Sequence, residues 1–448
     1  VSLWTDEAAT ARTMSADLAG YVDKILFDEP SMAGYYLVLR PWAAVFGTSE
    51  AALRSLSALA AVATVPFLYL AGLRLGGRRV AVAAAALLVA NAFVLRYALE
   101  ARSYALELLL ITIATWLLIR NADPEREPSR TAWILYAVAL AAAIWIHLYA
   151  VFAAAAHAVW LWWLGGPARR PGLRAAGMAV LAAVPVTIAI VVWGPVRAWL
   201  DAPTFDSALE TLATLVGATE RGLAGTLLSV AYLAAVAATA AVVARRWAPH
   251  GDRAAGDRWL LLLAIAVPVG AGLAVSTVKP IFVDRSLIVT VPALHLLLAS
   301  ALALIPRTWP AAAVLIAVLA LSTSQAMHGT IDKADWRGAI DAVASEARAG
   351  DSLLVFPAEH SSDAARYYAA REPALADMPI QDAVAPLGEA ADGRGRIWLL
   401  AYDVPPGVRI HDGALDRELS RRGYRLEETR PFHRLTLEVY TPPAAAVE

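Results

Sequence analysis

The sequence predicts a polytopic α-helical membrane protein of about ten transmembrane helices, followed by a small extracytoplasmic α/β domain. Of the 448 residues, 59% are hydrophobic and only 17% are charged, whereas soluble domains average about 25% charged residues. Apolar runs long enough to cross a hydrocarbon core of roughly 30 Å recur along the chain. Frequent charges and short β-like runs appear only after residue 328.

Composition also excludes several classes of function. The formal net charge is -1 and no long Lys/Arg run is present, so nucleic-acid binding is not expected. The chain contains no cysteine, which excludes disulfides, thiolate catalysis and Cys-ligated metal centres. It opens on a polar loop at Val1, without an initiator Met or a signal-type apolar stretch. We therefore expect that one helix of the full protein precedes this residue.

Ten apolar runs are candidate membrane spans, since a span needs about 20 residues at helical rise. A soluble fold could not bury so many such runs in succession. The expected spans lie near residues 55–74, 80–96, 104–119, 132–147, 148–164, 175–194, 223–244, 259–276, 286–305 and 310–326.

Lysines and arginines are concentrated in alternate short loops, which predicts the orientation. The positive-inside rule places the richer loops in the cytoplasm. Residues 1–54 and everything after Met327 then lie outside, and a helix before Val1 would bring the total to eleven. The richer loops carry fourteen such residues, Arg74, Arg78, Arg79, Arg120, Arg126, Arg130, Arg169, Arg170, Arg174, Arg245, Arg246, Arg253, Arg258 and Arg307; the other loops carry six, Arg96, Arg102, Arg197, Arg221, Lys279 and Arg285.

Two domains are expected, a transmembrane domain of residues 1–328, with 1–54 as its first outer loop, and a soluble α/β domain of residues 329–448. In the second domain, β-like runs at 352–356, 397–401 and 435–440 alternate with helical stretches at 336–348 and 415–422. It lacks the glycine-rich motifs of nucleotide-binding loops.

The first outer loop begins with adjacent carboxylates, Asp6 and Glu7. A structural reading is a solvated loop, or acidic residues at the start of a helix, where the dipole favours negative charge. The stretch from Tyr35 to Val45 is amphipathic, and Arg40 within it could extend to the membrane interface.

Further polar groups lie in other outer segments. Glu100, Arg102 and Tyr104 fall between two spans, where ionisable groups are costly and usually serve a cavity or a partner. Lys279 and Arg285 lie in a later loop, where a simple pairing of Arg285 with Asp284 is the alternative. His147 lies at an outer turn, where a lone histidine is more often structural than a ligand. His157 and His295 fall inside spans and are expected to be packing residues.

What favours function is the convergence of seven ionisable residues from four separate outer segments. The orientation was derived from all the Lys and Arg residues in short loops, without regard to motifs. We therefore expect an outer pocket with carboxylates and cations, formed by Asp6, Glu7, Glu100, Arg102, His147, Lys279 and Arg285.

At these residues the chain resembles the GT-C superfamily of polyprenyl-phosphate-sugar-dependent glycosyltransferases. It resembles in particular the bacterial branch similar to protein O-mannosyltransferases and aminoarabinose transferases. The resemblance covers most of residues 1–300 in order, and the tail from Asp335 resembles the small outer domain of many bacterial members. The motifs that carry it are Ser2-Leu3-Trp4-x-Asp6-Glu7-Ala8, Tyr35-Tyr36-Leu37, Phe46-Gly47-x-Ser49-Glu50, Leu53-Arg54-x-x-Ser57-Ala58-Leu59, Glu100-x-Arg102-x-Tyr104-Ala105-Leu106, and Lys279-Pro280 with Arg285.

The resemblance implies transfer of a sugar from a polyprenyl phosphate to an acceptor hydroxyl on a glycan, lipid or protein, with inversion and no obligatory metal. A divalent cation near Asp6 and Glu7 is left open. Such a donor already has a good leaving group, so the reaction needs a base for the acceptor hydroxyl and cations for the departing phosphate. Asp6 would be the base. The cations would be Arg285, Arg102 and Lys279, while Glu7, Glu100, Tyr104 and His147 would position arginines, sugar or acceptor.

Two rival functions remain open. A transporter or flippase of lipid-linked saccharides predicts charges at mid-bilayer depth and paired half-repeats, whereas this chain keeps its charges near one interface and shows no repeat. A non-catalytic scaffold predicts that neutralising Asp6 is harmless. The Ala- and Arg-rich composition suggests a high-GC bacterium. Mannose on decaprenyl phosphate, used at the outer face of the plasma membrane to build the cell envelope, is therefore the first candidate.

Overall fold

The computed structural model describes residues 2–125, 129–193, 201–220, 222–245, 253–328, 333–357, 360–384, 387, 395–404 and 414–443. The chain forms two compact units. A helical unit comprises residues 18–330, and a second unit combines residues 1–17 with residues 331–448. The sequence-based division at residue 328 differs from this partition in the first 17 residues, which belong to the second unit.

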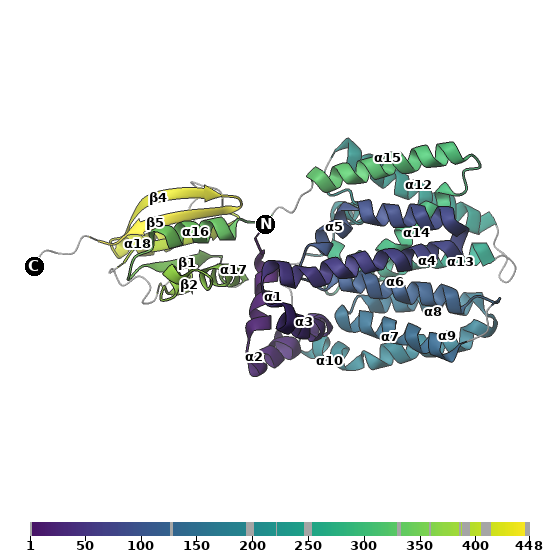
Figure 1. The fold of residues 1–448 in the computed structure, drawn as a ribbon, viewed down its shortest axis with the longest axis horizontal. Coiled ribbons are helices and arrows are strands. Elements are labelled where there is room, and N and C mark those ends of the chain that lie inside the picture. Colours follow the sequence, from purple (N-terminus) through teal and green to yellow (C-terminus); the bar gives the residue numbers. More distant parts are fainter. Residues whose placement is uncertain are drawn as a thin grey trace, which may run out of the picture. The chain divides into compact units, whose positions relative to one another are not determined.

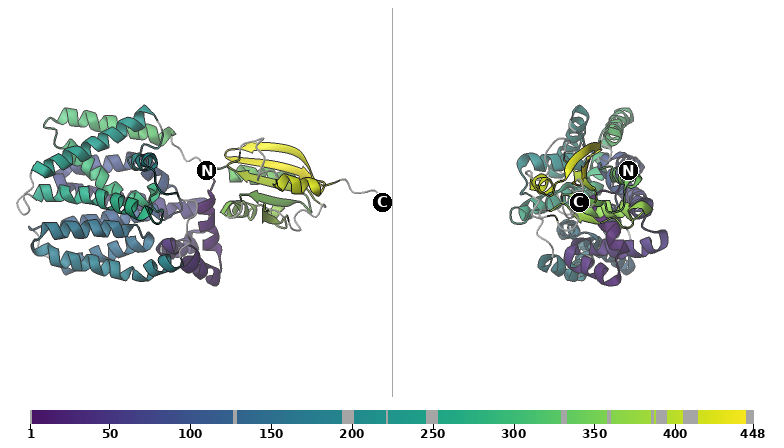
Figure 2. Two further views of the ribbon diagram at one scale, coloured as in Figure 1. Left: turned by 180° about the vertical axis from the view of Figure 1, so that it is seen from behind. Right: turned by 90° about the vertical axis from the view of Figure 1, so that its left-hand side faces the viewer.

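The helical unit is a bundle of long helices that run alongside one another, with the short helices α2 and α3 across one end (Figure 1). Figure 2 shows the same bundle from behind. Its elements are α2 (Leu18–Asp23), η1 (Lys24–Asp28), η2 (Pro30–Met32), α3 (Ala33–Phe46), α4 (Glu50–Ala90), α5 (Ala92–Ala98), α6 (Tyr104–Asn121), α7 (Arg130–Ile146), α8 (Ala150–Leu164), α9 (Gly166–Ala182), α10 (Val184–Val192), α11 (Phe205–Leu215), α12 (Leu223–Arg245), α13 (Arg253–Ser276), η3 (Asp284–Thr290), α14 (Val291–Leu302) and α15 (Thr308–His328).

Among the described residues, six helices are long and apolar enough to cross a membrane, and a seventh is obtained if α9 and α10, bent by 43°, form one span. All ten apolar runs expected from the sequence lie on helices, as far as the structure describes them. Two of the runs share α4, whose backbone is non-helical at Gly76 and Gly77. Two others correspond to the apolar helices α7 and α8, of 17 and 15 residues. The multi-pass helical membrane fold is thus confirmed.

Contacts between helix ends show which loops share an end of the bundle. Near the kink of α4, Arg74 forms an ion pair of 2.6 Å with Asp123, which follows α6. The Trp160 indole near the end of α8 donates to the Gly256 carbonyl near the start of α13 at 2.7 Å. These contacts join loops predicted to be cytoplasmic in two pairs, as expected if they share one end. Which side of a membrane this end faces stays a prediction.

The opposite end, here called the site end, comprises residues 24–36, 96–107, 147–149 and 276–290. Close packing holds it together. A Cβ on Gly34 in α3 would lie 2.3 Å from the Trp145 carbonyl oxygen near the end of α7, so only glycine allows this approach. The Ser57 hydroxyl of α4 donates to the Arg102 carbonyl at 3.2 Å. These contacts fix α3, α4 and α7 around the loop that precedes α6.

A buried polar node ties α5, α11 and α14 together near the same end. Asn91 caps α5 by accepting from the Val94 amide at 3.0 Å, and its side-chain amide donates to the Leu215 carbonyl at 3.2 Å. The same amide nitrogen lies 3.3 Å from Nε2 of His295, whose Nδ1 lies 2.7 Å from the Val291 carbonyl. Both ring nitrogens of His295 are thus satisfied, as expected for a packing residue.

The second unit is an α/β domain around one five-stranded sheet of order β2-β1-β3-β5-β4. β1, β2 and β3 pair in parallel, whereas β5 pairs antiparallel with β3 and β4. Its elements are α1 (Thr5–Ser15), α16 (Trp336–Glu346), β1 (Ser352–Phe356), α17 (His360–Ala369), η4 (Pro373–Leu375), β2 (Ile380–Asp382), β3 (Ile397–Tyr402), α18 (Ala414–Arg421), β4 (Arg425–Phe432) and β5 (Leu435–Thr441). All three strands expected from the sequence are present, so the predicted small α/β domain is confirmed.

Alternate residues of the buried strands face two separate cores. Leu353 and Trp398 pack with helices α16 and α17 on one face, and Leu354 and Leu399 pack with α18 on the other. Residues 2–17 join the first of these faces. Ala8 of α1 lies in that core. The Leu3 amide donates to the Tyr368 hydroxyl at 2.7 Å, and Arg12 pairs with Asp363 at 2.9 Å.

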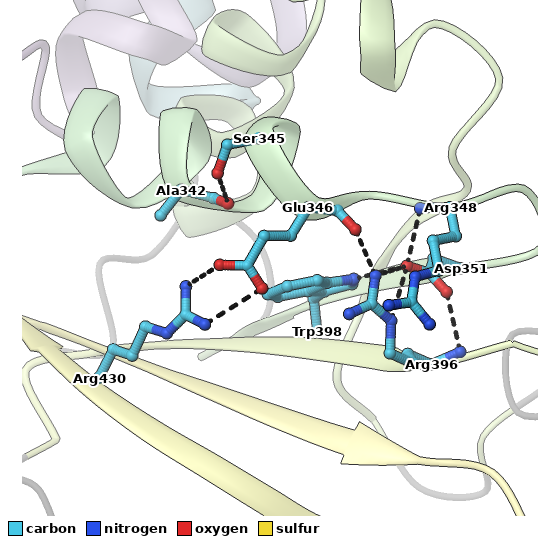
Figure 3. A network of polar contacts seen from close by, with 8 residues as sticks. All are labelled: Ala342, Ser345, Glu346, Arg348, Asp351, Arg396, Trp398 and Arg430. Atoms are coloured by element: carbon cyan, nitrogen blue, oxygen red, sulfur yellow. Dashed lines mark hydrogen bonds and ion pairs between the residues drawn. The ribbon is translucent and has the colours of Figure 1, made fainter.

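A polar network closes one edge of this domain (Figure 3). Asp351 accepts from Arg396 Nη2 at 2.8 Å, from the Trp398 indole at 3.0 Å and from the backbone amides of Arg348 and Arg396 at 3.1 and 3.0 Å. Burial would raise the pKa of Asp351, but these donors lower it below its usual value. Arg430 of β4 pairs with Glu346 of α16 at 2.7 Å. The network is a structural device, because its members satisfy one another.

Candidate active site

The loop between α5 and α6 places two ionisable residues in the interior of the helical unit. The Arg102 amide donates to the Glu100 carbonyl at 2.8 Å, which makes a tight turn. Glu100 is 1% exposed and Arg102 6%. Charged groups are seldom so buried without a partner or a role. Glu100 Oε1 accepts from Arg96 Nε of α5 at 3.4 Å, so the first carboxylate is held by an arginine.

Glu29 is the carboxylate that faces Arg102, with 3.8 Å between Arg102 Nη1 and Glu29 Oε2. Lys24 lies 3.3 Å from the other Glu29 oxygen, and the Tyr36 hydroxyl donates to Glu29. Burial alone would raise the pKa of Glu29, but Arg102, Lys24 and the Tyr36 hydroxyl together lower it to about 2. Glu29 is therefore ionised at neutral pH.

Glu29 and Tyr36 are not among the site residues predicted from the sequence. A signal was present, because Asp28-Glu29-Pro30 is a pair of acids in a loop between spans and Tyr35-Tyr36 opens the amphipathic stretch. Nothing in that pattern specified which acid faces inward. In the structure, the side chain of Asp28 is 67% exposed and that of Glu29 18%.

The 276–285 loop adjoins the same loop. Asp284 is close enough to Arg96 and Tyr97 to act on both electrostatically. The loop that contains Arg285 therefore adjoins the segment that contains Glu100 and Arg102. The Ser276 hydroxyl accepts from the amides of Ile281 and Phe282 at 3.0 and 2.9 Å and so fixes the loop's path.

The three predicted phosphate ligands differ in accessibility. The Arg285 amide is capped by Asp284 Oδ1 at 2.7 Å, and its side chain is half-buried. Lys279 is exposed. Arg102 is buried against Glu29. Of the three, only Arg285 is half-buried.

An aromatic row continues from this cluster toward α7. The rings of Tyr97 and Tyr104 lie 4.8 Å apart, those of Tyr104 and His147 5.9 Å, and those of His147 and Tyr149 6.5 Å. The structure thus brings together the predicted residues Tyr104 and His147. It adds Glu107 of α6, whose Oε2 lies 3.6 Å from His147 Nδ1.

Asp6 and Glu7 belong to the other compact unit. Both lie in the first turn of α1. Glu7 is buried and forms an ion pair of 2.7 Å with Lys333, which is also buried. It also accepts from the Trp4 amide at 3.3 Å. Asp6 is half-buried. Glu7 therefore has a structural partner within its own unit, whereas the expected pairing was with an arginine or a sugar hydroxyl.

Metal-ligating side chains do not cluster in this site. Within the described ranges, no group of three or more His, Asp or Glu residues is arranged to hold a metal ion.

Comparisons with known proteins agree with this architecture. The family model for dolichyl-phosphate-mannose-protein mannosyltransferases matches residues 28–199. The structure is similar to that of ArnT from Cupriavidus metallidurans in the apo state, at 13% identity over 98% of this chain and 94% of that chain, with a TM-score of 0.65. For ArnT bound to undecaprenyl phosphate, the identity is 13%, the coverage 90% and 87%, and the TM-score 0.60.

An archaeal relative of the fold is more distant. The oligosaccharyltransferase AglB from Archaeoglobus fulgidus, in complex with an inhibitory peptide and a dolichol-phosphate, is 12% identical over 88% of this chain and 65% of that chain, with a TM-score of 0.50. A sequence comparison with curated proteins finds no match.

The helical bundle and its polar site end define a membrane-embedded protein with the fold of ArnT. The family model over residues 28–199 and the ArnT-like fold agree with the resemblance to the GT-C superfamily that the sequence motifs indicate.

Proposed function

We propose that this chain is an inverting glycosyltransferase that moves a sugar, with mannose as the first candidate, from a polyprenyl-phosphate carrier to an acceptor hydroxyl. The observation that carries the proposal is a group of four ionisable side chains, two of them buried, at one end of an apolar bundle. Arg96, Arg102, Glu29 and Glu100 lie at helix ends and in the adjoining loops. There the hydrocarbon chain of a lipid phosphate would lie against apolar helices, and its phosphate would contact cationic side chains.

The proposed division of labour follows the chemistry of the donor. Asp6 takes the proton of the acceptor hydroxyl, while Arg285 is the principal ligand of the leaving phosphate, assisted by Arg102 and Lys279. Partial burial favours Arg285 in this role, because an ion pair with phosphate is stronger where water is partly excluded. Glu100, Tyr104 and His147 position the sugar or the acceptor. The binding of undecaprenyl phosphate to ArnT supports a carrier of this class.

Incubation with lipid-linked donors tests the reaction. Membranes that contain the protein are incubated with labelled polyprenyl-phosphate sugars that differ only in the sugar, and membranes with Asp6→Asn serve as the control. We expect one donor to be consumed, with label transferred to a hydroxyl-bearing acceptor. Consumption of none by the parent protein would contradict the proposal. Movement of intact donor across the membrane without transfer would favour the transporter alternative.

The proposed site faces the outside of a bacterial plasma membrane, and topology can be tested because the chain has no cysteine. We expect Asp377→Cys in the second unit to react with a membrane-impermeant thiol reagent in intact cells. Glu125→Cys after α6 should react only in permeabilised cells. The permeabilised sample is the control for accessibility. Reaction of Glu125→Cys in intact cells would reverse the orientation.

A further inference from the structure

Glu107 and His147 form a buried polar contact at the site end. The Glu107 side chain is 0% exposed and that of His147 14%. Among the described residues, neither carboxylate oxygen of Glu107 has a hydrogen-bond partner, and neither has Nδ1 of His147. The 3.6 Å between Glu107 Oε2 and Nδ1 is an ion-pair distance, too long for a hydrogen bond.

Two other buried histidines show what a purely structural site in this bundle looks like. His157 of α8 has Nε2 at 3.3 Å from the Thr115 hydroxyl and Nδ1 at 3.2 Å from the Tyr136 hydroxyl. His295 likewise has a partner at each ring nitrogen. His147 differs from both, because no hydrogen bond to its ring is formed by the residues that the structure describes.

A buried carboxylate without hydrogen bonds is costly, so its retention calls for a reason. Here the carboxylate lies in the first turn of α6, where the helix dipole favours its charge. It faces one nitrogen of a ring that lies between Tyr104 and Tyr149. Contacts of this kind are often long without a ligand and shorten when one binds.

We propose that Glu107 is a positioning residue that holds Nδ1–H of His147, so that Nε2 accepts a hydrogen bond from a hydroxyl of the donor sugar or of the acceptor. The proposal rests on the proposed function of this chain. A carboxylate fixes the proton on the nearer ring nitrogen, which leaves the lone pair on the other. The tyrosine rings on either side then limit the directions from which a hydroxyl can approach.

Paired substitutions test the proposal in the full-length protein. Glu107→Gln keeps the size of the buried side chain but removes its charge. In His147→Gln, the side-chain amide is placed near the position of Nε2, whereas in His147→Asn it is near that of Nδ1. We expect Glu107→Gln to lower kcat/KM roughly tenfold, and we expect His147→Gln to retain more activity than His147→Asn. Because Glu107 acts through His147, its substitution should cost little more in the His147→Asn background.

Separate titrations of donor and acceptor identify the hydroxyl. A rise in KM for the donor assigns the contact to the sugar, and a rise in KM for the acceptor assigns it there. His157→Gln is the matched control, since it disturbs a buried histidine of the same bundle. It should lower the thermal midpoint without changing either KM.

The outcomes separate this inference from the function on which it rests. A parent protein that consumes no donor would remove the proposed function, and this inference with it. If the parent transfers sugar, two results would overturn the present proposal alone. In the first, Glu107→Gln leaves kcat/KM unchanged; in the second, Glu107→Gln lowers kcat/KM equally with and without the His147 ring. If Glu107→Gln does not fold, Glu107→Asp is used instead. Its effect on kcat/KM is again compared between the parent protein and His147→Asn.

Discussion

The ionised groups at the site end of the helical unit and those of the second unit are satisfied in different ways. In the second unit, Asp351 accepts from five donor groups on three residues, and Arg430 pairs with carboxylates at the surface (Figure 3). At the site end, Arg102 is nearly fully buried, and 3.8 Å separates its Nη1 from Glu29 Oε2. Ionisable groups at membrane depth are costly and usually serve a cavity or a partner. The difference points to function at the site end and to structure in the second unit.

The same contrast between a functional and a structural role applies to the adjacent residues Asp6 and Glu7. The largest loss of turnover is expected for Asp6. Asp6→Asn keeps the side-chain shape but removes the basic lone pair, so turnover should fall by roughly two to four orders of magnitude. Donor binding should change little. The loss of a charge near the helix start costs only about 0.3–1 kcal/mol, so the protein should stay folded. Transfer of labelled sugar and donor binding, measured on the same preparation, check this.

Glu7→Gln is the control for Asp6→Asn. It leaves the buried Lys333 without its counter-ion, and such a loss typically costs roughly 3–5 kcal/mol. We expect unfolding of the second unit at a lower temperature, with turnover per folded molecule reduced less than in Asp6→Asn. If Asp6→Asn binds donor and transfers sugar at close to the parent rate, Asp6 is not the base.

The contribution of the site end to stability can be tested by pH through Glu29. Its pKa is about 2 in the folded protein, against an ordinary value of 4.5. At 1.36 kcal/mol per pH unit this corresponds to roughly 3 kcal/mol of stabilisation at neutral pH. Because the folded pKa is the lower one, the stabilisation is complete above pH 4.5 and is lost as the pH falls toward 2. The thermal midpoint of the helical unit should fall across that range.

Substitution separates Glu29 from its neighbours. Glu29→Gln should lower the midpoint at pH 7, since Arg102 loses its carboxylate, and should flatten the acid dependence. Asp28→Asn is the matched control, because the Asp28 side chain is 67% exposed and lies 3.8 Å from Lys24. An acid profile that is the same for Glu29→Gln and the parent would show that other groups produce it.

Arg285→Ala should weaken donor binding more than any other single arginine change in the outer loops. A charge-assisted hydrogen bond to phosphate in a partly dry site is worth roughly 1.5–3 kcal/mol, or about tenfold to a hundredfold in Kd. Arg120→Ala, near the opposite end of the bundle, is the control and should leave Kd unchanged. Unaltered donor affinity in Arg285→Ala would move the phosphate site, with Arg102 as the next candidate.

Much of the fold could be predicted from the sequence, because span length and hydrophobicity are local properties. The ten apolar runs and the strands of the second unit all correspond to observed elements. The attachment of residues 2–17 to the second unit could not be predicted, since it depends on contacts such as Arg12 with Asp363, 351 positions apart. No local pattern encodes such a pairing.

The candidate site was predictable by residue type but not by partner. Glu100, Arg102 and Arg285 could be identified as candidates, because ionisable residues near a membrane interface are costly to bury. Glu29 and Glu107 were missed for different reasons. Glu29 resembles its exposed neighbour Asp28 in sequence, and Glu107 lies within an apolar run, where one acid could face either lipid or protein. Which side chain turns inward is decided by helix packing, as the contact between α3 and α7 at Gly34 illustrates.

The smallest effect is expected at Arg430, within the network of Figure 3. Its partners Glu346 and Glu428 are exposed, and surface ion pairs contribute little because water screens them and both side chains lose freedom. Arg430→Ala should therefore change neither the thermal midpoint of the second unit nor sugar transfer by a resolvable amount. Asp351→Asn is the informative comparison. It places an amide donor among donors in a buried position, at a cost of roughly 1–3 kcal/mol in folding free energy. A large loss of transfer in Arg430→Ala, with folding intact, would instead assign a functional role to this edge of the second unit.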